Sequence, residues 1–274
     1  MQVGKTQYLE VSEKNDDGLF LRDEEGNGVF LAKFFADENL QIGDKTEVFI
    51  YQEKGNLKAT TEVPYCEVGE YAVMEAVQVL PSGAFMDWGI IKDLFVPFKK
   101  QGIGIQEGKN YLVKVYLDEE TDLITGTTKF KKTNSVADID LKEGEEVQLV
   151  VLNSSDLGWN VLINKKYFGL VYHSDVYKRL QPFSEEKGFV KTIREDGKID
   201  VTLQPEGYKN IDVYQEKILS ELKRKNGIIH LSDKSDPEDI KRLLQMSKKN
   251  FKKAIGGLYK DGIIEILPNK IRMK

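Results

Sequence analysis

Short stretches rich in β-branched and aromatic residues, separated by polar turns, fill the first three quarters of the chain. Examples lie at residues 47–51, 112–116 and 147–152, and turns such as 195–198 contain glycine beside charged residues. Short strands with this punctuation are typical of small barrels or sandwiches. The pattern therefore predicts that residues 1–205 are β structure almost throughout.

The strand pattern repeats along the chain. Residues 43–51 match residues 108–116, and a third, shorter copy contains Val190. When Val48, Val113 and Val190 are taken as equivalent, the spacings are 65 and 77 residues. A unit of this size suits one five-stranded barrel and is too long for a thin solenoid repeat. We expect three barrels in tandem.

The first halves of the second and third units also match. Each has a strand, a loop, a glycine (Gly83 or Gly158) with an aromatic within two residues, and a further strand. The first unit shows no such glycine–aromatic element in this reading and is expected to be divergent. The predicted domains are residues 1–63, 64–135 and 136–207 for the barrels and 208–274 for a different domain.

The hydrophobic period changes after residue 205. Apolar residues recur at helical spacing over 211–222, and a short strand follows at 228–231. Ser235 and Ser247 are candidate caps of two more helices, and residues 263–273 read as a hairpin. This order is that of a winged helix-turn-helix. The predicted fold class is mainly β, with three tandem barrels and a C-terminal α+β domain.

Charge is unevenly distributed over the 274 residues, whose formal net charge is −5. Residues 211–274 hold 15 Lys and Arg against 9 Asp and Glu, a net of +6, which leaves −11 for the rest. A negative surface repels nucleic acid, so any polynucleotide must bind through local patches.

The composition argues against several kinds of active site. Cys66 is the single cysteine, which excludes a disulfide framework and a thiolate zinc cluster, and His173 and His230 are the only histidines. The sequence contains no phosphate-binding Gly-x-x-x-x-Gly-Lys-Ser/Thr loop. We expect no catalytic residue, no metal and no cofactor. A nuclease site assembled from carboxylates is the enzymatic alternative.

The sequence shows no membrane-spanning or secretion signal. No stretch approaches the roughly 18 apolar residues that span a bilayer, and residues 1–10 lack an apolar signal core. We expect a cytoplasmic protein that does not contact a membrane.

Two sets of motifs resemble a known family. The strand–Gly-Ala-Phe and Gly-Leu-Val-x-x-Ser elements, at residues 83–85 and 169–174, resemble the S1-like RNA-binding OB domain. Residues 231–240 and 251–258 resemble the C-terminal domain of the conserved virulence factor B family. In that family three S1-like barrels precede a winged helix, and the members bind RNA and regulate gene expression. The resemblance covers essentially the whole chain and implies the same fold and function here.

The resemblance also implies where RNA would bind on the barrels. Phe85 stands at one of the two aromatic positions of an S1-like domain, and Tyr172, with His173 beside it, replaces a usual histidine. Trp159 is one residue out of register, which turns it to the other face of an ideal strand. Unpaired bases stack on rings while cations contact phosphates, so the candidate residues are the rings of Phe85, Trp159, Phe168, Tyr172 and His173 and the cations Lys165, Lys166, Lys191, Arg194 and Lys198. The alternative role for the rings is core packing.

The last predicted helix carries a row of lysines. Lys248, Lys249, Lys252 and Lys253 lie on the faces that Phe251, Ile255 and Leu258 leave free, and Lys270 and Arg272 lie in the predicted wing. Lysine brings charge without base-specific geometry, which favours contact with the phosphate backbone. A solvated lysine face is the alternative.

We therefore expect an RNA-binding regulator of gene expression that holds single-stranded RNA on the barrels and the winged helix. Three alternatives remain open at this point. One is a DNA-binding transcription regulator that uses the winged helix. The others are a protein-interaction scaffold that docks through the acidic first unit, and an RNA-processing enzyme.

Overall fold

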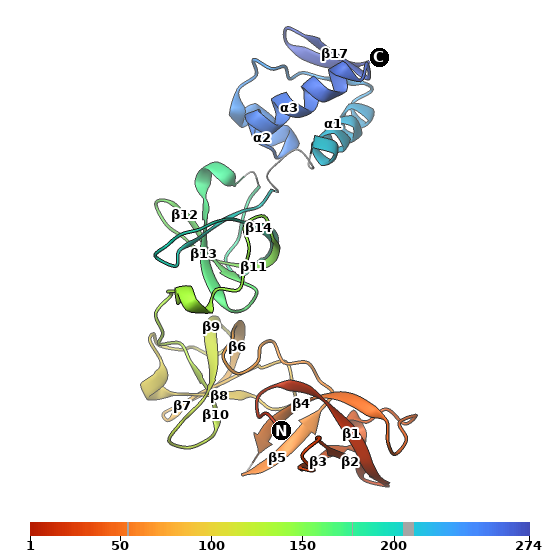
Figure 1. Ribbon diagram of the computed structural model, residues 1–274. Helices are drawn as coiled ribbons and strands as arrows, with labels where there is room; N and C mark the ends of the chain where they lie inside the picture. The colour runs from red at the N-terminus through yellow and green to blue at the C-terminus, as the bar shows by residue number, and fades with distance from the viewer. Residues whose placement is uncertain (54, 177, 205–210) are drawn as a thin grey trace. The chain divides into compact units, whose positions relative to one another are not determined.

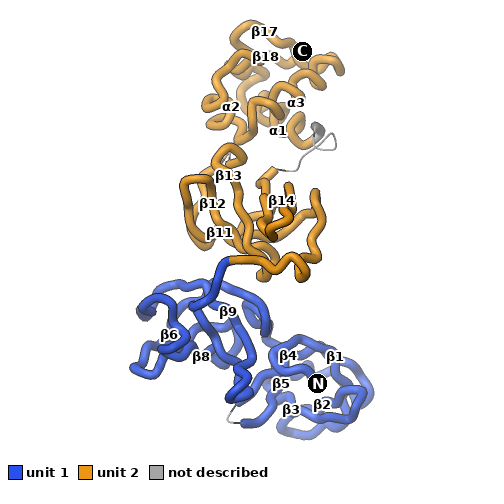
Figure 2. Tube along the Cα trace, turned by 60° about the vertical axis from the view of Figure 1, so that its left-hand side comes forward, with its two compact units in different colours: residues 1–132 blue, residues 133–274 orange. Residues whose placement is uncertain are grey.

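A computed structural model describes residues 1–53, 55–176, 178–204 and 211–274. The chain divides into two compact units, Met1–Lys132 and Thr133–Lys274 (Figure 2). The first unit ends at Lys132, near the predicted boundary between residues 135 and 136. The predicted boundary between residues 207 and 208 lies outside the described residues, and the exact four-domain division stays a prediction.

Barrel 1 is a closed five-stranded barrel with strand order β1-β2-β3-β5-β4. Its apolar positions alternate with polar ones, so that Leu9, Val11, Leu19 and Leu21 fill the interior. A short 3₁₀ turn, η1 (Lys33–Phe35), follows the third strand. The strands are β1 (Thr6–Asn15), β2 (Gly18–Arg22), β3 (Gly28–Ala32), β4 (Lys45–Glu53) and β5 (Asn56–Thr60).

Barrel 2 has the same succession of strands, in a five-stranded sheet of order β10-β9-β6-β7-β8. Its core is built from side chains such as Met74, Met86, Leu94 and Val113. A second 3₁₀ turn, η2 (Phe98–Lys100), again follows the third strand. The strands are β6 (Tyr71–Leu80), β7 (Gly83–Met86), β8 (Leu94–Pro97), β9 (Asn110–Leu117) and β10 (Ile124–Thr127).

Barrel 3 is closed, in the order β11-β12-β13-β15-β14. Short 3₁₀ turns precede its first strand and follow its third, η3 (Val136–Asp138) and η4 (His173–Asp175). The strands are β11 (Glu146–Ser154), β12 (Gly158–Ile163), β13 (Tyr167–Tyr172), β14 (Glu185–Ile193) and β15 (Ile199–Thr202). Val48, Val113 and Val190 are each buried on the fourth strand of their barrel, which confirms the repeat inferred from the sequence.

The two barrels of the first unit share an apolar junction. The ring of Phe49 from β4 meets Trp88 of barrel 2 edge-on, with centroids 5.3 Å apart, and Phe49 and Tyr51 belong to the same buried cluster as the barrel 2 core. The backbone of Val68 donates to the carbonyl of Gly4 at 3.0 Å. The C-terminal end of β4 is therefore packed against barrel 2.

The C-terminal domain has the predicted winged-helix order. Its helices are α1 (Ile211–Arg224), α2 (Pro237–Leu244) and α3 (Lys248–Lys260), and its strands β16 (Ile228–Ile229), β17 (Ile264–Leu267) and β18 (Lys270–Met273) form a sheet of order β16-β18-β17. Figure 1 shows α3 beside the β17–β18 hairpin. The mainly β fold class with three barrels and a winged helix is confirmed.

The N-cap of α3 is the predicted serine, whereas the N-cap of α2 lies one residue after the predicted one. Ser247 caps α3 as predicted, since its hydroxyl accepts from the backbone of Asn250 at 3.1 Å. The cap of α2 is Asp236, whose carboxylate accepts from the backbone of Glu238 at 2.8 Å. Ser235 instead accepts from the backbone of Ser232, within the turn before the helix.

Candidate nucleic-acid interface

A glycine at the start of the second strand aligns the three barrels. A Cβ on Gly18, Gly83 or Gly158 would lie 2.2, 2.4 or 2.2 Å from a carbonyl oxygen of the third strand. Only glycine allows the two strands to approach this closely. The three glycines are therefore structurally equivalent, and the residues that follow them can be compared position by position.

In barrels 1 and 2 a phenylalanine lies two residues after this glycine and faces a second phenylalanine on the third strand. Phe20 faces Phe30 across β2 and β3, and Phe85 faces Phe95 across β7 and β8. The ring centroids are 5.1 Å apart in both pairs. Their strand neighbours point into the cores, so the rings lie on the outer faces of the barrels. Both faces offer rings on which an unpaired base can stack.

The pair in barrel 1 corrects an expectation from the sequence. Gly18-Leu19-Phe20 is the same glycine–aromatic element as Gly83-Ala84-Phe85, so the first unit does not lack it. The spacing of this motif is visible in the sequence. Phe30 and Phe95 carry no such local signal, because the register between strands makes them partners.

Two further exposed rings lie in the 3₁₀ turns after the third strands. Phe34 in η1 is 84% exposed and Phe98 in η2 is 67% exposed. Lysines accompany both, with Lys33 and Lys99 exposed in the same turns. Ala32 pairs with Gly18, and Pro97 pairs with Gly83. Each 3₁₀ turn begins at the residue directly after this partner of the glycine. Exposed rings and ammonium groups thus adjoin the end of each phenylalanine face.

Barrel 3 lacks the phenylalanine pair. Asn160 and Leu170 occupy the equivalent positions on β12 and β13. Trp159 is half-buried and packs against the barrel core together with Val161 and Ile163, which confirms that it is turned to the other face of the strand. Phe168 is only 8% exposed, so the prediction that its ring stacks on RNA is wrong.

Tyr172 and Arg194 meet at the C-terminal end of β13. A guanidinium nitrogen of Arg194 donates to the hydroxyl of Tyr172 at 2.6 Å and to the carboxylate of Asp200 at 2.7 Å. The Asp200 carboxylate raises the pKa of Arg194. His173 in η4 is exposed, and its Nε2 lies 2.9 Å from the carbonyl oxygen of Ser155. The Arg194 guanidinium is therefore engaged by the buried Asp200 carboxylate, which leaves it less available to a phosphate.

The other predicted cations of barrel 3 are paired or lie elsewhere. Lys191 pairs with Asp175 at 2.8 Å, and Lys198 pairs with Asp196 at 2.5 Å and lowers the pKa of that carboxyl. Lys165 and Lys166 lie in the β12–β13 turn, at the opposite end of the hairpin from Tyr172. Lys166 is also 3.5 Å from a carboxylate oxygen of Asp140. The structure does not gather these lysines into one positive patch, and their RNA-binding roles stay predictions.

The lysines of α3 are differently placed. Phe251, Ala254, Ile255 and Leu258 turn into the core of the winged helix, which leaves Lys249, Lys252 and Lys253 exposed and Lys248 half-buried. Within the described ranges, no ion pair involves Lys248, Lys249 or Lys252. In the wing, Arg272 pairs with Glu265 at 2.6 Å and Lys270 is half-buried. The α3 face can therefore attract phosphates without first breaking an ion pair at those three lysines.

A further basic cluster in the second unit was missed by the sequence reasoning. Lys178 and Arg179, which follow η4, and Lys241 and Arg242 on α2 line one cavity of about 380 Å³. Lys178 pairs with Glu186, and Arg242 pairs with Asp239 at 2.5 Å. Two Lys-Arg dipeptides are visible in the sequence, but only the fold brings them together.

No group of three His, Cys, Asp or Glu side chains that could hold a metal ion occurs in the part of the chain that the structure describes. The expectations that the chain is not an enzyme and needs no cofactor stay predictions. Among the described helices, none is both long enough and apolar enough to cross a membrane.

Comparison with known domains gives the class of protein first. Residues 3–62 match the S1 domain, and residues 216–273 match the CvfB-like winged helix domain. S1 and winged-helix domains are nucleic-acid-binding types and not enzymatic ones, so the fold and the comparisons together indicate a nucleic-acid-binding protein. The match at residues 3–62 also places an S1 domain in the unit that was expected to be divergent.

Whole-chain comparison then gives the relatives. A protein named conserved virulence factor B from Staphylococcus saprophyticus is 27% identical over 99% of this chain and 94% of its own length. Its namesake from Staphylococcus aureus strain N315 is 28% identical with the same coverage. The resemblance to the conserved virulence factor B family is confirmed.

A solved structure also resembles the chain. It is a multidomain protein with nucleic acid binding domains from Streptococcus pneumoniae. The two sequences are 22% identical, and the match covers 99% of this chain and 98% of that protein. The TM-score is 0.43.

Proposed function

We propose that this protein binds single-stranded RNA and acts as a post-transcriptional regulator of gene expression. The observation that carries the proposal is the pair of outward phenylalanine faces, Phe20–Phe30 and Phe85–Phe95. Rings on an open barrel surface stack unpaired bases, whereas the bases of a duplex are already stacked on one another. The unpaired lysines of α3 supply the phosphate contacts.

The charge distribution supports backbone contact rather than sequence reading by α3. Its exposed cations are lysines, which lack the planar fork with which arginine recognises guanine. Base contacts would therefore come from the barrels. The regulatory part of the proposal rests on the likeness to proteins named conserved virulence factor B.

The test is binding of the full chain to an unstructured RNA, the DNA strand of the same sequence, and the RNA duplex, each over a range of salt concentrations. We expect the single-stranded RNA to bind most tightly, with a log–log salt slope of about −0.7 for each phosphate neutralised. Absent or salt-insensitive RNA binding contradicts the proposal.

A second candidate function is duplex DNA binding through the winged helix. The unpaired lysines of α3 favour it, since they can neutralise the phosphates of either nucleic acid. A duplex DNA of the same sequence, added as a fourth ligand under the same salt series, tests this alternative. A full-length protein that prefers duplex DNA to single-stranded RNA would support it.

A further inference from the structure

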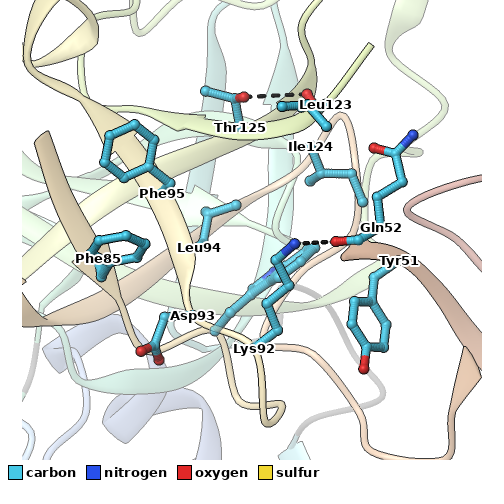
Figure 3. Close-up of a pocket in the computed structure, with 11 residues that line it drawn as sticks. Tyr51, Gln52, Phe85, Lys92, Asp93, Leu94, Phe95, Leu123, Ile124 and Thr125 are labelled. Atoms are coloured by element: carbon cyan, nitrogen blue, oxygen red, sulfur yellow. Dashed lines mark hydrogen bonds between the residues drawn. The ribbon is translucent and has the colours of Figure 1, made fainter. Parts of the chain in front are cut away.

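A cavity of about 200 Å³ lies in the first unit beside the Phe85–Phe95 pair. Figure 3 shows Phe85 and Phe95 on one side of it and Tyr51 and Gln52 of β4 on the other, with Lys92 between them. Ligand pockets for drug-sized molecules measure roughly 300–1,000 Å³. This cavity is therefore of a size for a smaller group, such as a single planar ring system.

The floor and walls of the cavity are mainly apolar. Trp88, Leu94 and Ile124 line it together with the two phenylalanines. The Phe85 and Phe95 rings thus belong both to the outer stacking face and to the cavity wall. A polynucleotide that stacks on this face would have the cavity within reach of an adjacent base.

Polar groups at the junction give the cavity hydrogen-bonding capacity. Lys92 donates from its ammonium group to the backbone carbonyl of Gln52, and its nitrogen lies 5.9 Å from the centroid of the Tyr51 ring. Among the described residues, the side-chain oxygen Oε1 of Gln52 is buried without a hydrogen-bond donor. An acceptor buried without a donor is unfavourable, so a ligand that supplies the donor once the amide turns into the cavity gains affinity.

The electrostatics favour a neutral ligand over an anion. Burial lowers the pKa of Lys92, whose ammonium group is already engaged with the backbone carbonyl of Gln52. Asp93 also lines the cavity, and its pKa is raised by burial and by Asp87. A phosphate would meet the carboxyl group of Asp93, which repels it when ionised, whereas a nucleobase brings planar faces for the rings and N–H groups for Gln52.

We propose that this cavity takes one nucleobase of the bound RNA, in addition to the bases that stack on the outer faces. The base would lie against Phe85 and donate from an N–H or amino group to Gln52, and Lys92 would donate to an acceptor on the base. The inference rests on the proposed RNA-binding function and adds a base-recognition pocket formed where two barrels meet.

The chain contains a reporter for occupancy of the cavity. Its two tryptophans are Trp88, which lines the cavity, and Trp159, which lies in barrel 3. In the full-length Trp159→Phe variant, emission therefore comes from Trp88 alone. Titration with adenosine, cytidine, guanosine and uridine tests entry of a base, and titration with ribose 5-phosphate tests entry of a sugar phosphate without a base.

We expect at least one nucleoside to change Trp88 emission in a saturable way, and ribose 5-phosphate to leave it unchanged. Gln52→Leu should weaken that nucleoside about 5- to 10-fold, the range for losing one hydrogen bond in a buried site. The substitution removes an unpartnered buried acceptor, so it should not unfold the barrel. Gln106→Leu is the matched control, since Gln106 is exposed and lies outside the cavity lining.

Two results overturn the inference. One is that no nucleoside changes Trp88 emission, and the other is that Gln52→Leu binds every nucleoside as well as the parent does. A response to ribose 5-phosphate equal to that of the nucleosides would assign the cavity to phosphate instead. RNA binding by the full chain is measured separately, so bound RNA with an empty cavity refutes the pocket alone, and absent RNA binding refutes the proposed function.

Discussion

Barrels 1 and 2 differ from barrel 3 at one structurally equivalent position. All three barrels have the glycine that brings the second and third strands together, at Gly18, Gly83 and Gly158. Two residues later the first two barrels have a phenylalanine that faces a second phenylalanine, whereas barrel 3 has Asn160 facing Leu170. A conserved strand order therefore does not guarantee a conserved binding face.

The cations show a complementary difference. In barrel 3, Lys191, Arg194 and Lys198 each pair with a carboxylate, while three lysines of α3 have no ion pair among the described residues. Ion-paired surface cations add little net attraction for phosphate, because the partner carboxylate repels it. We infer that stacking belongs to barrels 1 and 2 and that most phosphate attraction in the second unit belongs to the winged helix.

The largest expected effect is that of removing the α3 lysines. Substituting Lys248, Lys249, Lys252 and Lys253 together by Ala should reduce the magnitude of the RNA salt slope by about 2, at roughly 0.7 for each of the three lysines without an ion pair in the described ranges. It should lower affinity roughly 100-fold near 0.1 M salt. The measurement is filter binding of a full-length variant whose circular dichroism spectrum matches that of the parent.

A matched control removes four lysines that pair with carboxylates in barrel 3. Lys166, Lys187, Lys191 and Lys198 pair with Asp140, Glu146, Asp175 and Asp196. Replacing these four by Ala changes the net charge equally and leaves four unpaired carboxylates, so it should weaken the long-range attraction for RNA. Because ion-paired lysines are expected to make no direct phosphate contact, the affinity loss should still be clearly smaller than that of the α3 variant. Equal losses from both quadruple variants would show that ion pairing does not distinguish the two regions.

The next effect is that of the stacking faces. Phe20→Leu combined with Phe85→Leu should lower RNA affinity at least about 30-fold, because each stacked base contributes about 1–3 kcal/mol. The salt slope should stay unchanged, since no charge is removed. Fluorescence anisotropy with a labelled single-stranded RNA over a salt range measures both quantities.

Tyr8→Leu is the control for loss of an aromatic ring. Tyr8 is an exposed ring on β1 of barrel 1, outside the second and third strands. Its removal should leave affinity within about 2-fold if stacking is confined to the phenylalanine faces. A loss as large as that of Phe20→Leu alone would place RNA on a different surface of the barrel.

The smallest expected effect on RNA binding concerns Arg194. Arg194→Gln should change RNA affinity less than about 2-fold, because the guanidinium is paired with Asp200. The same change should lower the stability of the second unit, since Asp200 is buried and loses its charged partner. Urea denaturation measures the stability, and anisotropy measures the RNA affinity. A large affinity loss with unchanged stability would indicate that Arg194 contacts RNA.

Local patterns were sufficient to predict the elements of the fold. The repeat through Val48, Val113 and Val190 predicted three barrels, because an alternating strand with turns at both ends is a local property of the chain. The change to helical spacing after residue 205 and the serine cap at Ser247 predicted the winged helix for the same reason. The one-residue offset of Trp159 likewise predicted its turn toward the core.

The proposed binding surface depends on contacts that no local pattern predicts. Phe30 and Phe95 become ring partners only through the register of neighbouring strands, and the burial of Phe168 follows from contacts that its local sequence does not show. Lys191 is neutralised by Asp175, 16 residues earlier in the chain, and Tyr51 and Lys92 approach one another only where barrel 1 packs on barrel 2.

By itself, therefore, the sequence determined the number of barrels, their strands and the winged helix that follows them. Only the tertiary structure decided which rings face solvent, which cations retain their attraction for phosphate, and that a cavity lies between two barrels. The physical reason is that periodicity and capping act within a few residues, whereas exposure and charge pairing depend on which distant segments come into contact.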